Sequence, residues 1–499
     1  MIINHIFLFI LLISTVCKSI EVNSNNGLLI RSAIPIENKT WENWNGEIHI
    51  FPNAIFEPSA LEDLIDIVKL AKINNKTIRC AAQGHTISSL SVTENYLVVV
   101  TNLNKVTVQK HPKYGWTATA EAGISLSDFE TILRNYDPPL TIDSATSYNT
   151  FRVSGVIATG SHGTKTSSSI MPDQLCSIKI VIGSGEVSLL GIIYSATFRV
   201  QPMYKLRMTN NFILINEWLN PKNIKTILES SDGIEFYYWP FNGFNQSDPN
   251  PLDPNRDNIW IIILVRTDEP VSFTQQQLEQ LHESQRQYEI QQYELRSSLV
   301  QNPEATPNIT ATLWNNFTSN GNTSFVYQAP DAIHHEVSEE SIKYELMEIA
   351  FKVDPDFSNI VTEYRYIMKL LYDFARKGKF PLNVYVKFRI IKSTETLLSN
   401  IFNKNPEVLY CHVNFLTVLG TPSWEEFAEL IALRFFDKYK AKPHWAKEWE
   451  FIPNVRSYLS EVLSDQIKKF EKVREKYDPD KIFFDNKSLQ DIFSKTLDS

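Results

Sequence analysis

The segment 154–163, with the sequence SGVIATGSHG, constrains the fold of this chain most. Glycines and other small residues let a backbone approach a pyrophosphate closely, so that its N–H groups can bind the negative charge. We therefore expect a dinucleotide ligand. A G-x-G-x-x-G fingerprint between a first strand and a helix is absent, so the fold that holds the ligand is not a Rossmann fold.

The size and charge of the chain narrow the choice further. A chain of 499 residues exceeds what one hydrophobic core usually supports, so two or more lobes are expected. The formal net charge of -9 argues against a nucleic acid or an anionic membrane as partner, because either would favour a basic face. A small neutral or cationic substrate suits this charge better.

The N-terminus resembles a secretory signal. An apolar block at 6–13 is too short to span a bilayer, and Thr15 and Cys17 are small enough for a signal-peptidase site. We expect residues 1–18 to be a cleaved signal peptide, which predicts a secreted or lumenal protein without a stable membrane span. The alternative is a signal anchor that is never cut.

Seven Asn-x-Ser/Thr sequons support the secretory route. They begin at Asn38, Asn75, Asn245, Asn308, Asn316, Asn322 and Asn486. The three between 308 and 324 predict an exposed, glycosylated loop over 302–324. Once Cys17 is removed with the signal, Cys80, Cys176 and Cys411 remain, so one disulfide at most is possible.

Periodicity predicts a mixed α/β lobe in the first 200 residues. A capping box and helical spacing indicate a helix over 60–74. Strands are expected over 77–81, 96–101 and 116–121, and a short helix over 125–134. Longer, aromatic-rich segments begin near 201–203, where we expect a second lobe to start. The segment 274–297 has the pattern of a surface helix.

Several motifs resemble those of the vanillyl-alcohol-oxidase superfamily of FAD-linked oxidases. They are Pro58-x-x-x-Glu62-Asp63, Gly84-His85-Thr86, Ala122-Gly123 and the segment 155–163. Further on, Lys387-Phe388-Arg389 and the sequence PHWAK at 443–447 resemble the aldonolactone oxidases, including gulonolactone and arabinonolactone oxidases, and the related alditol oxidases. The resemblance covers most of residues 41–490, and the order and spacing of the motifs make it specific.

The resemblance implies an α+β fold, with a two-subdomain FAD-binding lobe of the PCMH type and an inserted α/β substrate (cap) domain. The expected divisions are a signal peptide at 1–18, the FAD-binding domain at 19–205, the cap domain at 206–430 and a C-terminal segment at 431–499 that returns to the flavin. Relatives with a Gly-His-Ser motif carry the flavin covalently on that histidine through its 8α-methyl group, and His85 stands at the matching place. A histidyl link favours hydride acceptance by the cofactor.

The residues expected to contact FAD follow from the same motifs. They are Gly84, His85, Thr86, Gly123, Ser154, Gly155, Thr159, Gly160, His162, Gly163 and Ile192. For His162 the resemblance implies phosphate-loop geometry rather than chemistry. No metal site is expected.

The candidate catalytic residues are Arg389, Lys387, His444 and Lys447. Related enzymes bind lactone or polyol with a Glu-x-Arg pair that faces the flavin, and Arg389 matches its arginine. Lys387 stands where the glutamate should be, and a cation there would reverse the local field and put ordinary catalysis in doubt. The alternative places both charges on an outward strand face. His444 and Lys447 match residues that relatives place near the flavin, where a cation stabilises its reduced, anionic form.

A second departure from the family lies at 183–189. Relatives run through a longer segment there, beside the adenine and ribose, before a strand resembling 190–194. The shortening weakens the cofactor assignment without removing it.

The sequence thus predicts an FAD-dependent oxidase of a sugar-derived alcohol, with an aldono-1,4-lactone as the expected substrate. The substrate would pass a hydride to flavin N5, and oxygen would then reoxidise the flavin and yield hydrogen peroxide. An alditol oxidase, or an oligosaccharide oxidase of the berberine-bridge type, is the alternative within enzymes. The absence of cysteine between Cys80 and Cys176 argues against the second flavin link that berberine-bridge enzymes often carry. A secreted, catalytically impaired pseudoenzyme that binds sugar is the alternative from another class.

Overall fold

The computed structural model describes residues 34–183, 191–336 and 340–497. The predicted signal peptide and almost all of the 183–189 connection lie outside the described residues. The described residues belong to one compact unit. Across these three ranges, no helix is long and apolar enough to cross a membrane.

The first lobe begins with a small parallel sheet. Its strands are β3 (Ala54–Phe56), β5 (Tyr96–Val99) and β4 (Ile78–Ala81), in the order β3-β5-β4. Helix α1 (Leu61–Ile73) joins β3 to β4. It begins here because the Asp63 carboxylate accepts hydrogen bonds from the backbone N–H of Ser59 and Ala60, at 2.8 and 3.1 Å.

A second, antiparallel sheet completes this lobe. Its strands run in the order β6 (Val106–His111), β7 (Gly115–Glu121), β10 (Gly191–Arg199) and β9 (Leu175–Ile182). Helices α2 (Leu126–Arg134) and α3 (Val153–Ala158) pack on it through a shared apolar core. The predicted pair of subdomains in an α+β fold is confirmed.

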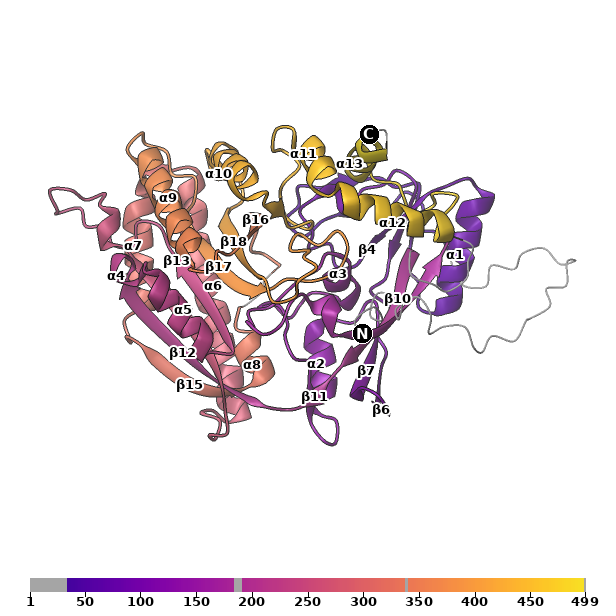
Figure 1. Cartoon of the computed structure of the whole chain (residues 1–499), viewed down its shortest axis with the longest axis horizontal. Helices are drawn as coiled ribbons and strands as arrows, with labels where there is room; N and C mark the ends of the chain where they lie inside the picture. The colour runs from indigo at the N-terminus through magenta and orange to yellow at the C-terminus, as the bar shows by residue number, and fades with distance from the viewer. Residues whose placement is uncertain (1–33, 184–190, 337–339, 498–499) are drawn as a thin grey trace, which may run out of the picture. The chain divides into compact units, whose positions relative to one another are not determined.

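The rest of the chain builds one eight-stranded antiparallel sheet, in the order β15-β12-β14-β13-β17-β18-β16-β19 (Figure 1). Its strands are β12 (Lys205–Leu214), β13 (Gly233–Tyr238), β14 (Asn258–Thr267), β15 (Thr323–Gln328), β16 (Tyr344–Lys352), β17 (Tyr385–Lys392), β18 (Leu409–Val418) and β19 (Lys442–Pro443). Helices α5 (Pro221–Ser230), α9 (Ser358–Ala375) and α10 (Trp424–Tyr439) share one large core with the central strands.

Side chains alternate between the two faces of a strand, and this alternation decides which residues reach the site. In β17, Val386, Phe388 and Ile390 belong to the helix-covered core. Lys387 and Arg389 therefore point to the opposite face, as do the polar residues of β13, β16 and β18. The sheet thus has an apolar face toward the helices and a polar central face.

The surface helix predicted at 274–297 is confirmed as α6 (Gln275–Ser297). The loop predicted over 302–324 is wrong, because α7 (Thr306–Phe317) occupies its centre. The helix forms because Leu313, Trp314 and Ala311 bury an apolar stripe against the sheet, which outweighs the Asn and Thr content of the segment.

The C-terminal helices α11 (Val455–Val462), α12 (Ser464–Tyr477) and α13 (Lys487–Leu497) return to the first lobe (Figure 1). The Ile78 N–H donates to the Ile482 carbonyl at 2.7 Å, which ties the end of the chain to β4. The remaining short elements are β1 (Trp41–Glu42), β2 (His49–Ile50), β8 (Leu140–Thr141), β11 (Gln201–Pro202), α4 (Ile215–Trp218) and α8 (Ala329–Ile333). Cys80, Cys176 and Cys411 are free thiols.

Candidate active site

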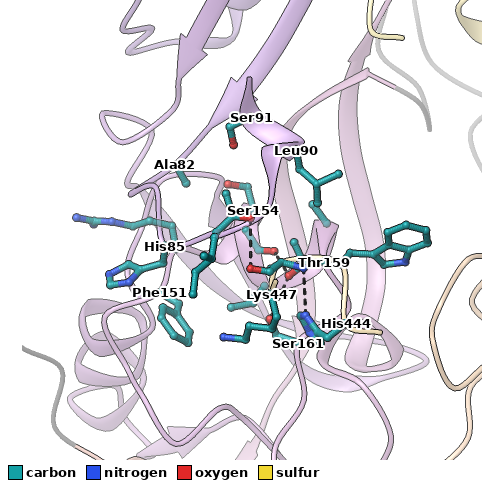
Figure 2. A pocket seen from close by; sticks show the side chains of 18 of the residues that line it. Ala82, His85, Leu90, Ser91, Phe151, Ser154, Thr159, Ser161, His444 and Lys447 are labelled. Carbon is teal, nitrogen blue, oxygen red and sulfur yellow. Dashed lines mark hydrogen bonds between the residues drawn. The ribbon is translucent and has the colours of Figure 1, made fainter. Parts of the chain in front are cut away.

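Residues of the first lobe, the polar face of the large sheet and the C-terminal segment line a cavity of about 570 Å³. Its volume is typical of ligand sites. Figure 2 shows the lining of this cavity in the first lobe, including His85 and Ser154, beside His444 and Lys447. The predicted residues that line it are Gly84, His85, Thr86, Ser154, Gly155, Thr159, His162, Ile192, Lys387, Arg389, His444 and Lys447. Every candidate catalytic residue and most candidate cofactor residues therefore meet in one place.

Two motifs that are 360 positions apart in sequence form one wall of this cavity. The Ile87 N–H donates to the Ala446 carbonyl at 2.9 Å, and the Ser88 hydroxyl donates to the Trp445 carbonyl at 2.6 Å. Gly84 permits this turn because its φ of +76° lies in the left-handed region. The loop that carries His85 is thereby fixed against the loop that carries His444 and Lys447.

His85 lies between two aromatic rings. Its ring centroid is 5.3 Å from that of Trp44 and 5.1 Å from that of Phe151. Burial, together with the positive charge of Lys447, lowers the pKa of His85 to about 4. The imidazole is therefore neutral at physiological pH, and one ring nitrogen has a lone pair available for bonding.

Gly123, Gly160 and Gly163, three predicted cofactor residues, do not line the cavity. A Cβ at Gly123 would lie 2.0 Å from the Val100 carbonyl oxygen, and one at Gly163 would lie 2.3 Å from that of Ala145. Gly160 has a φ of +68° in the turn after α3. Gly123 and Gly163 are thus required for close packing of the backbone, and Gly160 for its left-handed conformation, so these glycines shape the lobe.

The glycine-rich segment nevertheless presents backbone to the cavity at Ser154 and Gly155. Beyond Gly155 there is open space, since an added Cβ would meet no atom within 4 Å. Arg152 lines the same wall and is held by Gln83, with Nε to Oε1 at 2.9 Å. Open backbone beside a fixed guanidinium fits the pyrophosphate of a dinucleotide, so these residues suit FAD.

The side chain of His162 is part of a polar cluster that the sequence-based expectation did not include. Its side chain is buried, its Nε2 lies 2.9 Å from Glu348 Oε1, and its ring centroid lies 3.8 Å from that of His412, with the two rings tilted by 40°. The reason is that β16 and β18 of the other sheet approach the glycine-rich segment, which sequence spacing cannot show.

Glu348 is the centre of this cluster. It also accepts hydrogen bonds from His412 Nδ1 at 2.9 Å, Asn414 Nδ2 at 3.2 Å and Arg389 Nη2 at 3.3 Å. Although burial favours the neutral acid, the interactions with His162 and His412 keep the pKa of Glu348 well below its ordinary value. Glu348 is thus an anion that orients Arg389.

The ligand atoms of His162, Glu348 and His412 lie within 4.8 Å of one another, which is close enough for a metal ion. The guanidinium of Arg389 contacts the same carboxylate, however, and would repel a cation. The cluster is therefore better suited to positioning Arg389 than to binding a metal.

Lys387 and Arg389 are 2% and 7% exposed, so the alternative of an outward-facing charged pair is wrong. Lys387 Nζ lies 2.7 Å from Glu235 Oε2 and 3.3 Å from Glu336 Oε1. The reversed field expected from a lysine at this position does not follow, because two carboxylates compensate its charge.

His444 and Lys447 line the cavity from the C-terminal segment. Burial lowers the pKa of His444 to about 4, and the Ala446 N–H donates to its Nδ1 at 3.2 Å. The neutral ring therefore carries its proton on Nε2 and acts as a donor there. Burial also lowers the pKa of Lys447, which increases the fraction of neutral amine.

Sequence reasoning missed Arg152, Glu336, Glu348, His412 and Asn414. Strand alternation around His412 and Asn414, between Cys411, Val413 and Phe415, could have indicated a polar face in that strand. The alternation of polar and apolar residues does not show which strands are neighbours in the sheet.

Comparison with known proteins assigns the family. Residues 52–191 match the model of FAD binding domains, and residues 196–491 match the model of D-arabinono-1,4-lactone oxidases, which is more than half of the chain. The chain belongs to the D-arabinono-1,4-lactone oxidase family. The predicted resemblance is thereby confirmed.

Relatives of this family member include the D-arabinono-1,4-lactone oxidase of Kluyveromyces lactis, 31% identical over 41% of this chain and 42% of that protein. The L-gulonolactone oxidase of Scyliorhinus torazame is 24% identical over 47% of this chain and 53% of that protein. The matched region thus spans about half the length of these curated relatives. Among solved structures, cholesterol oxidase from B. sterolicum superposes with a TM-score of 0.72 at 15% identity, covering 92% of this chain and 97% of that one, which shows a shared fold.

Proposed function

We propose that this protein is an aldonolactone oxidase that oxidises the 2-hydroxyl carbon of an aldono-1,4-lactone. The observation that supports this most is the single cavity in which His85 and the open backbone at Gly155 meet Arg389, His444 and Lys447. An alditol is the alternative substrate, since the same groups bind hydroxyl and carbonyl oxygens alike.

The reaction breaks a C–H bond and an O–H bond of the substrate. FAD, when bound, supplies the acceptor for the two electrons, and oxygen finally takes two electrons and two protons to form hydrogen peroxide. Arg389 and the Nε2–H of His444 are suited to hold substrate oxygens, so that the C–H bond is aimed correctly. Lys447 is the candidate acceptor for the hydroxyl proton, because burial raises its neutral fraction.

We further propose that FAD is attached covalently to His85. The neutral imidazole, held between Trp44 and Phe151, supports a bond to the flavin through a ring nitrogen. His85 also lines the same cavity as the candidate catalytic residues.

The proposed location is the secretory pathway or the extracellular space, with residues 1–18 removed as a signal peptide and with N-linked glycans. The asparagines of six sequons, Asn38, Asn75, Asn245, Asn308, Asn316 and Asn322, are exposed, which supports their modification.

Two measurements test the proposed function. A visible absorption spectrum, followed by acid precipitation and in-gel fluorescence, detects flavin that stays on the polypeptide. We expect a yellow protein whose bound flavin is lost in His85→Ala, together with peroxide release from D-arabinono-1,4-lactone. A colourless protein that FAD cannot reconstitute would support a pseudoenzyme, and peroxide release with alditols alone would change the substrate.

A further inference from the structure

Lys387 belongs to a compact group of side chains on the polar face of the large sheet, which we call the Lys387 cluster: Glu235, Tyr237, Glu336, Lys387 and Ser147. Lys387 Nζ contacts Glu235 Oε2 at 2.7 Å, Glu336 Oε1 at 3.3 Å and Ser147 Oγ at 3.4 Å. The Tyr237 hydroxyl donates to Glu235 at 2.6 Å and is also 2.8 Å from Glu336. The ammonium is thus enclosed by acceptors.

Glu336 supplies a negative charge beside position 387. Burial opposes ionisation of Glu235 and Glu336, but Lys387, together with His335, keeps the pKa of both below the ordinary value. His335 Nε2 lies 3.4 Å from Glu235 Oε2, and this interaction outweighs burial and raises the pKa of His335. The carboxylate that the Glu-x-Arg pattern has at position 387 is therefore present nearby, on Glu336.

The two carboxylates differ in their access to ligand. Glu336 lines the cavity together with Ser147, Tyr385, Lys387 and Arg389, whereas Glu235 does not and is 1% exposed. Glu336 lies in the segment after α8 and not in β17, so its carboxylate reaches Lys387 from a different part of the chain. It is the carboxylate of the cluster that a substrate can touch.

Glu336 is held in place by its neighbours and retains acceptor capacity. Its Oε1 is contacted by Tyr237, Lys387 and the Tyr385 hydroxyl, the last at 3.2 Å. Ser147 donates to Oε2, and among the residues that the structure describes it is the one donor to that oxygen. A carboxylate oxygen accepts about two hydrogen bonds, so Oε2 has room for one more.

We propose that Glu336 is a substrate-specificity residue that accepts a hydrogen bond from a substrate hydroxyl, in place of a carboxylate at position 387. This proposal rests on the proposed function. Lys387 lies beside Glu336 and holds its carboxylate by an ion pair, so a substrate hydroxyl can donate to the remaining acceptor position of Glu336 Oε2.

The first test replaces the carboxylate with its amide. In Glu336→Gln we expect the KM for D-arabinono-1,4-lactone, and the Kd measured from lactone-induced changes in flavin absorbance, to rise about 10- to 100-fold, since a hydrogen bond to a charged acceptor is lost. The kcat should change far less. Flavin content and melting temperature establish that the variant is folded. The matched control is Glu363→Gln, because Glu363 is likewise an ion-paired carboxylate shielded from solvent but lies outside the cavity lining.

The second test compares lactones that each lack one hydroxyl, other than the reacting one. We expect wild type and Glu336→Gln to bind one of these analogues with equal affinity. That analogue lacks the hydroxyl that donates to Glu336, so removing the acceptor as well has no further effect.

The outcomes separate the two proposals. If wild type binds and oxidises the lactone while Glu336→Gln has unchanged KM and Kd, the role of Glu336 is overturned and the proposed function stands. If every deoxy analogue distinguishes the two proteins as the parent lactone does, the role of Glu336 is likewise overturned. If flavin-loaded wild type neither binds nor oxidises the lactone, the proposed function falls, and the role of Glu336 falls with it.

Discussion

The carboxylate of Glu348 on β16 lies 2.9 Å from Nε2 of His162 in the glycine-rich segment, so a buried hydrogen bond connects the large sheet to the FAD-binding lobe. Both side chains are 2% exposed. The same carboxylate holds Arg389, so the position of this guanidinium in the cavity depends on the contact between the two lobes.

We expect Glu348→Gln to lower the free energy of unfolding by about 3–5 kcal/mol, because the buried guanidinium of Arg389 loses its counter-charge. Urea denaturation measures this change. In contrast to Glu363→Gln, which removes a buried carboxylate elsewhere, Glu348→Gln should also reduce kcat/KM for the lactone. Equal kcat/KM in the two variants would contradict the positioning role.

Arg389→Lys keeps the charge but removes the planar fork. We expect kcat/KM for the lactone to fall about 10- to 100-fold with flavin content unchanged, because an ammonium cannot contact Glu348 and a substrate oxygen in the same geometry. Steady-state peroxide release measures the loss. An unchanged kcat/KM would show that charge alone is sufficient at this position.

Acid should destabilise the protein through His444. The pKa of this buried histidine is about 4 in the folded state and near 6.5 when unfolded, so the unfolded state binds more protons between these values. The stability that His444 contributes is complete above pH 6.5 and decreases by up to about 1.4 kcal/mol per pH unit as the pH falls toward 4. Denaturation at several pH values measures the slope, and His444→Gln should make it shallower. A slope that this substitution leaves unchanged would assign the acid sensitivity to other groups.

Two glycine substitutions should have opposite consequences. Gly123→Ala places a Cβ 2.0 Å from the Val100 carbonyl oxygen, so we expect little folded protein. Gly155→Ala meets no atom within 4 Å and should fold normally, but its methyl group enters the cavity and should weaken FAD binding roughly tenfold. Thermal melting and flavin titration measure both effects. A well-folded Gly123→Ala would contradict the packing argument.

The sequons should differ in glycosylation. Asn486 is 4% exposed and its Nδ2 donates to the Ser89 carbonyl at 2.8 Å, so we expect it to stay unmodified. Asn308, Asn316 and Asn322 are exposed and should carry glycans. Peptide mass spectrometry after glycosidase treatment in heavy-oxygen water measures the occupancy of each site. Absence of glycan from every sequon would contradict the proposed secretory location.

Local patterns were sufficient for much of the fold. Capping and periodicity at 60–74, and alternation at 116–121, predicted α1 and β7 because these signals depend on near neighbours. The same reasoning failed at 302–324, where polar composition suggested a loop. The apolar stripe of α7 is stabilised by distant strands, and such tertiary packing overrides local preference.

The sequence by itself determined the family motifs, the candidate residues and the order of the lobes, because each depends on residue type and spacing along the chain. Only the tertiary structure decided that Lys387 is neutralised, that His162 binds Glu348, and that Gly123 serves packing. These outcomes depend on side chains from strands far apart in sequence, such as Glu235 opposite Arg389 in the pairing of β13 with β17. Strand order sets those encounters, and no local pattern encodes it.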